Sequence, residues 1–219
     1  VADGKGTAGA ALSYGMTNVD SDNAADAETD VDSYQVSLYG DYDIGNNAYV
    51  EGVASYAWNS NDMTRHATSA TTQNADYDSS LWNARAEVGR AYDVGADGLT
   101  LTPNVSANYW HYSADGYTET GTGALLTVGD SDLDALELGL GVDAKWSMMN
   151  EDGSKVEPVV RVGYSYDAIG DNLEVTSNFV GSTGTTFDTQ GADPARSTFN
   201  VGAGVDFYSA NNWQVKADY

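Results

Sequence analysis

The sequence has no cysteine, only three prolines, and only nine basic residues among its 219. Without cysteine, the chain can form neither a disulfide framework nor a thiolate metal site. Scarce proline leaves backbone N–H groups free to pair in long strands. Nine Lys and Arg residues against 33 Asp and Glu residues give a formal net charge of −24, which would repel a nucleic-acid backbone. We therefore exclude disulfide-stapled scaffolds and nucleic-acid partners.

Long apolar runs are also missing. No stretch approaches the ~20 apolar residues that a membrane-spanning helix needs, and the mean hydropathy is −0.41. This excludes a helical membrane protein, but not a β-barrel, whose strands are apolar on one face only. No secretion signal precedes Val1, so we expect that a signal has been removed or that the protein starts further upstream.

What the sequence does contain is alternation. In residues 34–42, apolar or aromatic side chains occupy the even positions and mostly polar ones the odd positions. This period of two recurs along the chain, without the i, i+3, i+4 spacing of an amphipathic helix. We expect about nine strands, several near the ~9–11 residues that cross a bilayer. The alternating segments are residues 10–16, 34–42, 50–58, 82–88, 99–109, 136–146, 156–166, 199–207 and 213–217.

The connections between these segments alternate in length. The short ones are residues 44–47, 93–98, 150–154 and 209–212. The long polar ones, which we expect to be loops, are residues 17–32, 59–80, 113–132 and 167–197. An up-and-down barrel has this rhythm when one rim faces the periplasm and the other the outside, whereas a soluble Greek-key sandwich has no reason to keep it. We therefore predict an all-β fold, an antiparallel up-and-down transmembrane β-barrel.

Aromatic residues lie on the apolar face near the ends of the predicted strands. Tyr34 and Tyr42 are at opposite ends of one strand, roughly 20 Å apart across the membrane at ~3.3 Å per residue and ~40° tilt. Two aromatic girdles are expected at the two membrane–water interfaces. The predicted girdle residues are Tyr34, Tyr42, Trp58, Trp82, Trp146, Tyr166 and Trp213.

The opposite, polar face of the predicted strands would line a lumen. Two interpretations of its charges stay open: they hold water and a threaded segment, or they brace the wall as ion pairs, such as Arg85 with Glu51. Both can hold at once. The predicted pore-lining residues are Gln35, Glu51, Arg85, Glu87, Asn104, Glu137, Asp143, Lys145, Glu157, Arg161, Asp206 and Lys216.

Three stretches carry a family resemblance. Residues 30–45 read DVDSYQVSLYGDYDIG, with a D-x-D-S-Y start. Residues 101–103 (LTP) precede residues 115–121 (DGYTETG), similar to an L-T-P … G-Y-x-E-x-G pattern. Residues 191–196 (GADPAR) are followed by VGAGVD, similar to a late loop and strand. In this order and spacing, the set resembles the translocator β-domain of bacterial autotransporters over nearly the whole chain.

The resemblance implies a barrel of twelve strands with a helical segment threaded through its pore. Residues 1–219 would then be a single barrel domain, starting just before the third strand and stopping within the eleventh. The implied function is to anchor the protein in the bacterial outer membrane and to support export of an upstream passenger to the cell surface. The implied partners are the passenger and its linker helix, the barrel-assembly machinery, and outer-membrane lipid and lipopolysaccharide. No cofactor is implied. The alternative is a self-contained porin-like or adhesin-like barrel.

An outer-membrane hydrolase is a further alternative. It would need one of the two histidines, His66 or His111, near the outer rim. Ser113 and Asp115 follow His111 closely, but spacing alone is weak support for a catalytic group. We therefore expect no enzyme and assign no catalytic residue.

A run of acids early in the chain is the only candidate for a metal site, and a soluble calcium-binding β-protein is the corresponding alternative. Carboxylate oxygens suit calcium, but this run lacks the glycine and the terminal glutamate of an EF-hand loop. We therefore expect a solvated acidic loop and no metal. The weak candidate ligands are Asp20, Asp22 and Asp26.

Overall fold

The computed structural model describes residues 5–21, 26–95, 98–182, 184–211 and 213–219. The regular elements in this part of the chain are β-strands. The strands along the main sheet are β1 (Gly6–Ser21), β2 (Ala27–Gly45), β3 (Ala48–Thr68), β4 (Thr71–Arg90), β6 (Leu99–Ala114), β10 (Ser131–Trp146), β12 (Lys155–Asp167), β15 (Ser197–Tyr208) and β16 (Gln214–Asp218). None of the described residues belongs to a helix that could cross a membrane.

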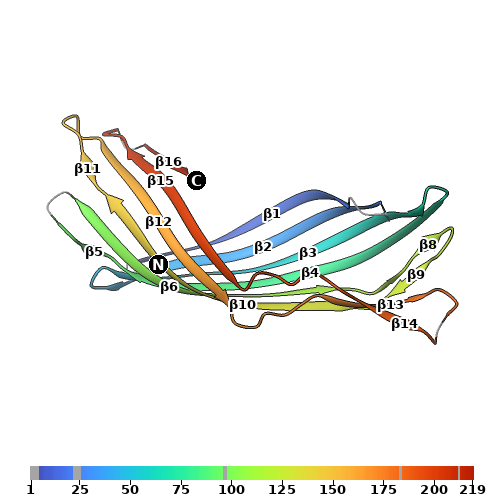
Figure 1. Ribbon diagram of the computed structural model, residues 1–219. Helices are drawn as coiled ribbons and strands as arrows, with labels where there is room; N and C mark the ends of the chain where they lie inside the picture. Colours follow the sequence, from blue (N-terminus) through green and yellow to red (C-terminus); the bar gives the residue numbers. More distant parts are fainter. Residues whose placement is uncertain (1–4, 22–25, 96–97, 183, 212) are drawn as a thin grey trace.

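Short strands complete the fold. Three of them pair with the main sheet: β5 (Tyr92–Asp93), β8 (Thr120–Gly121) and β11 (Met148–Met149). A separate four-stranded sheet has the order β14-β13-β9-β7 and consists of β7 (Tyr117–Thr118), β9 (Leu126–Val128), β13 (Glu174–Phe179) and β14 (Thr186–Gln190). Figure 1 shows this small sheet at the same end as the tip of the β3–β4 hairpin, with the short turns at the other end.

Each main strand pairs antiparallel with the next main strand along the chain, in the order β1-β2-β3-β4-β6-β10-β12-β15-β16. The sheet curls strongly, so that it forms a trough (Figure 1). The predicted all-β, antiparallel, up-and-down architecture is confirmed, and so is the estimate of about nine strands. The architecture is that of a half-barrel.

Large apolar side chains lie on the outside of this trough. Leu12, Leu38 and Leu140 are 85%, 62% and 64% exposed. The buried apolar side chains are small: Ala57, Ala75, Ala114, Ala135 and Val159. The described residues therefore build no core of large hydrophobic groups. A continuous exposed apolar surface of this kind is stable where it meets lipid rather than water.

The turn between β2 and β3 follows from its residue types. Asn46 and Asn47 both have positive φ, 56° and 59°, and Gly45 has φ 88°. Asparagine and glycine are the residues that tolerate this left-handed conformation, and two consecutive such residues make the tight hairpin turn that matches strand twist. The predicted short turn at residues 44–47 is therefore a hairpin.

Two predicted long loops are strands instead. The prediction is wrong for most of residues 17–32 and 59–80, because β1 continues to Ser21, β2 begins at Ala27, and β3 and β4 are separated only by residues 69–70. Beyond a membrane both faces of a strand meet water, so alternation of polarity disappears while the hydrogen-bonded ladder continues. We call these parts, residues 17–21, 27–32, 59–68 and 71–80, the outer extension.

A buried polar clasp holds the outer extension on its concave side. Arg65 donates from Nε and Nη2 to the two carboxylate oxygens of Glu119, at 2.8 and 2.7 Å, and the Glu119 side chain is 1% exposed. Gln73, fully buried, accepts a hydrogen bond from the Ala67 N–H at 3.0 Å. The rings of Tyr77 and Tyr117 stack with centroids 4.8 Å apart. The predicted loop 113–132 thus folds back against the β3–β4 hairpin.

Candidate functional site

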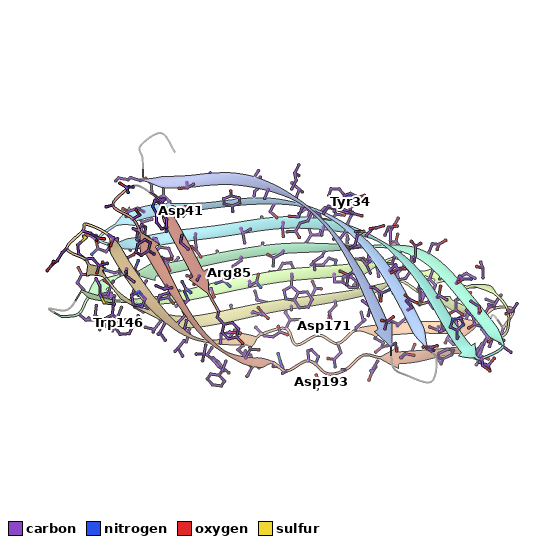
Figure 2. All side chains as sticks on the ribbon, turned by 90° about the horizontal axis from the view of Figure 1, so that it is seen from above. Tyr34, Asp41, Arg85, Trp146, Asp171 and Asp193 are labelled. Carbon is purple, nitrogen blue, oxygen red and sulfur yellow. The ribbon has the colours of Figure 1, made fainter. Side chains whose placement is uncertain are left out.

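A hollow of about 820 Å³ lies on the concave side, between β3, β4, β6, β10, β12 and β15. The alternation that exposes leucine on the convex face turns polar side chains towards the concave side. Figure 2 labels two of them, Asp41 on β2 and Arg85 on β4. Seven of the twelve predicted pore-lining residues border this hollow: Glu51, Arg85, Glu87, Asn104, Glu137, Asp143 and Arg161.

Glu87 lies at the centre of a group of hydrogen bonds in this hollow. Arg85 donates from Nη2 to Glu87 at 2.6 Å, and the Tyr49 hydroxyl donates to Glu87 at 2.8 Å. Residues i and i+2 of a strand share a face, so Arg85 reaches the acid on its own strand. The predicted pair of Arg85 with Glu51 is therefore wrong.

An acidic row crosses three neighbouring strands at this level. Glu51 is directly opposite Asp41 on β2 and directly opposite Glu87 on β4. Of the three, Glu87 has the donors described above, while no described side chain donates a hydrogen bond to Asp41 or Glu51. Asp41, Glu51 and Arg85 also border a smaller hollow of about 270 Å³ that continues along the wall. This side of the trough thus presents surplus negative charge.

The other side of the trough carries paired charges. Glu157 accepts hydrogen bonds from Ser147 at 3.0 Å, and its carboxylate lies 3.0 Å from Lys155 Nζ and 3.6 Å from Lys145 Nζ. The Glu157 side chain is 7% exposed. Burial of a carboxylate is tolerated because three donors surround it.

Three more ion pairs join β10, β12, β15 and β16. Arg161 donates from Nη1 to Asp218 at 2.6 Å, and its Nε lies 3.6 Å from Asp143. Lys216 Nζ lies 3.5 Å from Asp206. These bases are therefore matched by acids, so the surplus negative charge stays on the β2–β4 side. The remaining predicted pore residue, Gln35, donates to the Ser37 hydroxyl at 2.8 Å on the same face of β2.

Two tyrosines cover glycines on the concave side. A Cβ added to Gly9 would lie 2.5 Å from the ring of Tyr39, and one added to Gly89 would lie 2.5 Å from the ring of Tyr49. A ring can lie flat over a neighbouring strand only where that strand has no side chain. Glycine at these two positions therefore fixes where the rings lie, and Tyr49 is held where it reaches Glu87.

The predicted girdle residues lie at the two ends of the convex face. At the end with the outer extension, the rings of Tyr34 and Trp58 are 6.1 Å apart and those of Tyr56 and Trp82 are 4.8 Å apart. At the opposite end, Phe207 and Trp213 are 5.3 Å apart. Figure 2 shows Tyr34 and Trp146 towards opposite ends of the trough. Six predicted girdle residues are among the exposed large side chains: Tyr34, Tyr42, Trp58, Trp82, Tyr166 and Trp213.

Among the described residues, neither histidine hydrogen-bonds to Ser113 or Asp115, although His111 shares a face of β6 with Ser113. His111 Nδ1 lies 2.9 Å from Oδ1 of Asp134, and the Tyr109 hydroxyl donates to the same oxygen at 2.6 Å. His66 Nδ1 lies 3.3 Å from the backbone oxygen of Thr71. The acids beside His111 are Asp134 and, 4.0 Å from its Nε2, Asp132, both on the neighbouring strand β10. The hydroxyl that donates to Asp134 belongs to Tyr109 and not to a serine.

Two of the three candidate calcium ligands are described: Asp20 lies near the end of β1 and Asp26 directly precedes β2. Asp20 and Asp26 border a hollow of about 330 Å³ together with Glu28 and His66. Asp22 lies outside the described residues. Within the part of the chain that the structure describes, no group of three or more acidic or histidine side chains is arranged to hold a metal ion.

The comparisons with known proteins agree on one family. A model of the autotransporter β-domain matches residues 1–219. The "Serine protease pet autotransporter" of Escherichia coli O44:H18 is 29% identical over 192 residues, which are 87% of this chain and 14% of that protein. The "Uncharacterized protein YaiT" of Salmonella typhimurium is 23% identical over 191 residues, 87% of this chain and 18% of that protein. The chain spans less than a fifth of the curated relatives it matches.

A solved structure has the same fold. The translocator domain of the autotransporter NalP from Neisseria meningitidis superposes with a TM-score of 0.68, at 19% identity, covering 99% of this chain and 67% of that one. The curled antiparallel sheet with an apolar outside is thus the arrangement of an outer-membrane translocator barrel. Because the family model matches the whole chain, the chain belongs to the autotransporter β-domain family.

Proposed function

We propose that the hollow on the concave side is part of a pore through which a segment of the same protein passes to the cell surface. One observation carries this proposal: strands whose outer faces expose leucine surround a hollow bordered by Glu51, Arg85, Glu87 and Arg161. A barrel in lipid hides polar groups from the membrane, and a polar lumen can hold water and a passing chain. The twelve predicted residues are then pore-lining, and the seven predicted aromatics form the girdles.

The charge of the pore suggests what passes through it. The acids opposite one another on β2 and β3, Asp41 and Glu51, lack hydrogen-bond donors from the described side chains. A threaded segment with basic or amide side chains at this level would supply them. We propose this segment to be the linker helix that follows the passenger.

Further partners belong to the same proposal. Within the described residues, β1 and β16 each pair on one side only. Unpaired strand edges are not stable in lipid, so we propose that residues 1–219 are part of one barrel domain that further strands close. Assembly of such a barrel requires the barrel-assembly machinery, and its outer leaflet contacts are lipid and lipopolysaccharide. We assign catalysis, of the kind that the name of the Pet relative states, to no residue of this domain.

The test is to obstruct the hollow in the full-length protein. A Cβ on Gly163 would meet no atom closer than 3.6 Å, so Gly163→Trp projects a ring into the hollow without displacing the backbone. The matched control is Val160→Trp, whose side chain points to the convex face, is 40% exposed and does not border the hollow. Passenger at the surface is measured with protease added to intact cells, and barrel assembly by heat-modifiable electrophoretic migration.

We expect both barrels to assemble, while Gly163→Trp lowers surface passenger at least tenfold and Val160→Trp does not. Ser165→Trp is a second variant at a position that borders the hollow, and it replaces Gly163→Trp as the test if loss of the glycine prevents folding. Assembled barrels that export equally with either side chain would overturn the pore assignment.

A further inference from the structure

A second kind of hollow lies on the convex face, where the outer extension begins. It measures about 370 Å³ and lies over β2, β3, β4 and β6. Its floor is made of small side chains, because Ser80 is the cross-strand partner of Trp58 on one side and of Ser113 on the other. Because two neighbouring positions of the girdle, Ser80 and Ser113, carry serine and not an aromatic residue, there is room for a ligand beside the rings.

Aromatic rings form one wall of this hollow. The rings of Tyr34 and Trp58 are nearly parallel, with an interplanar angle of 17°, and Tyr56 lies 5.9 Å from Trp58. Trp58 is 47% exposed and Tyr34 48% exposed. Exposed ring faces carry partial negative charge and attract groups whose hydrogens are weakly positive, which include the C–H groups on the face of a sugar ring.

Carboxylates and hydroxyls form the opposite rim. Asp78 and Asp115 border the hollow together with Ser60, and the Asp115 N–H donates to the Asp78 backbone oxygen at 2.9 Å, which holds the two acids side by side. No described side chain donates a hydrogen bond to either carboxylate. A free carboxylate is acceptor-only and makes short, strong bonds with hydroxyl groups.

The combination selects the chemistry of a ligand. A ring stack alone would suit an acyl chain, but the carboxylates beside it disfavour a phosphate group at this position, and none of the described residues that border the hollow is Lys or Arg. The part of a lipid that binds here is therefore one without phosphate. A sugar satisfies both sides, since it offers C–H faces to the rings and hydroxyl donors to the acids. A pocket with aromatic walls and a few converging polar groups is the usual form of a small-ligand site.

We propose that this hollow, which we call the interface hollow, binds a sugar of the headgroup of an outer-leaflet glycolipid. The source is a membrane lipid because the hollow lies in the girdle at the end that carries the outer extension, where headgroups are located. The inference rests on the location of the barrel in the outer membrane and not on passenger export, so either can fail without the other.

The test uses the full-length protein purified in detergent and counts bound lipids by native mass spectrometry. The probes are purified lipopolysaccharide, the soluble core oligosaccharide of the same lipopolysaccharide, and phosphatidylglycerol, an anionic lipid whose glycerol headgroup contains no sugar ring. Trp58→Leu removes the stacking face but stays apolar. Trp213→Leu makes the same change in the opposite girdle, where Trp213 is 52% exposed. Asp78→Asn removes one charged acceptor at constant shape.

We expect Trp58→Leu to weaken lipopolysaccharide binding roughly fivefold, as for loss of one ring contact. Asp78→Asn should weaken it about threefold, and phosphatidylglycerol binding should not change. Trp213→Leu should leave both probes unaffected. Equal losses for Trp58→Leu and Trp213→Leu, or for both lipids, would overturn the proposal, as would core oligosaccharide binding as tightly as the intact glycolipid. If Trp58→Leu fails to fold, Asp78→Asn alone decides between these outcomes.

Discussion

The membrane-spanning part of β3 and β4 and their outer extension are continuous strands in different surroundings. In the first part, one face is exposed and apolar and the other borders the polar hollow. In the outer extension the outward face is polar, while the concave face is mixed and is fastened by Arg65 and Glu119 and by the stacked rings of Tyr77 and Tyr117. The hydrogen-bonded ladder runs through both parts without a break until Arg65. The backbone pairing is therefore the same in both parts, and only the polarity of the side chains differs, according to whether a face meets lipid or water.

Cross-strand partners show the same contrast. On the outward face of the membrane part, Leu38 is opposite Ala54, and small or aliphatic pairs pack against each other. In the outer extension, Asp62 is directly opposite Asp30 on one strand and Asp76 on the other. Like charges directly opposite each other are destabilising. The outer extension is therefore stabilised by the buried polar clasp, whereas the membrane part is stabilised by contact of its apolar face with lipid.

The largest expected effect comes from placing a charge on each part in turn. Leu140→Lys puts an ammonium group on the lipid-facing side and should lower stability by about 2–4 kcal/mol near the membrane midplane. Thr64→Lys, on the same outward face but in the outer extension, should change it by less than about 0.5 kcal/mol. Urea unfolding of the barrel reconstituted in vesicles measures both. Equal costs at the two positions would contradict the division into a lipid-facing and a water-facing part.

The second effect is confined to the outer extension. Glu119→Ala leaves Arg65 without its bidentate partner, and we expect a local loss of about 2 kcal/mol, because Arg65 remains 17% exposed and partly solvated. Limited proteolysis should nick residues 59–80 faster while the barrel keeps its heat-modifiable migration. Glu119→Gln, which keeps one hydrogen bond, is the control and should be intermediate. Global unfolding in step with the nicking would mean that the two parts do not act independently.

The third effect belongs to the concave face. Gly89→Ala forces a Cβ against the Tyr49 ring and should cost about 1–2 kcal/mol through displacement of that ring. Gly15→Ala has nothing within 4 Å of the new Cβ and should be neutral or slightly stabilising. Thermal unfolding in detergent compares the two. If the two substitutions lower the thermal stability equally, displacement of the Tyr49 ring adds nothing to the effect of replacing glycine.

The smallest effect is a dependence on pH in the outer extension. A hydrogen bond with Asp76, together with the charges of Asp30 and Asp32, raises the pKa of Asp62 above its usual value. A group whose pKa is raised by folding contributes stability that is complete below its unfolded pKa and is lost as pH rises through its folded pKa. Amide exchange in residues 59–80, corrected for its intrinsic pH dependence, should therefore speed up as pH rises through that window. Asp62→Asn should remove the trend, and a trend that survives this variant would need another group.

Alternation in the sequence predicted the membrane part well. Leu136, Leu138 and Leu140 alternate with Glu137 and Gly139, and the structure places this segment in β10 with two of the leucines exposed. Period two is a strong signal wherever the two faces of a strand meet different solvents. The strand order followed from the short connections, since consecutive strands usually pair.

The rest could not be predicted because its signal is not local. The outer extension lacks the apolar outward residues of the membrane part, so its sequence resembles a polar loop, and the prediction of long loops at residues 17–32 and 59–80 is wrong. Glu119 becomes buried only because Arg65, 54 residues away, meets it. Arg85 could reach an acid on its own strand or across to β3, and sequence does not rank the two. Tyr49 has the inward parity, yet its contact with Glu87 depends on the ring lying over Gly89.

In the proposed arrangement, one face of the membrane part meets lipid and the other a water-filled pore, and the lack of cysteine makes this arrangement directly measurable. Single cysteines would be placed at each position from 138 to 143 on β10 of the full-length protein in the outer membrane, and labelled with a charged, water-soluble thiol reagent. We predict labelling with period two: strong at positions 139, 141 and 143, and weak at positions 138, 140 and 142. Uniform labelling along the segment, or the opposite parity, would contradict the account.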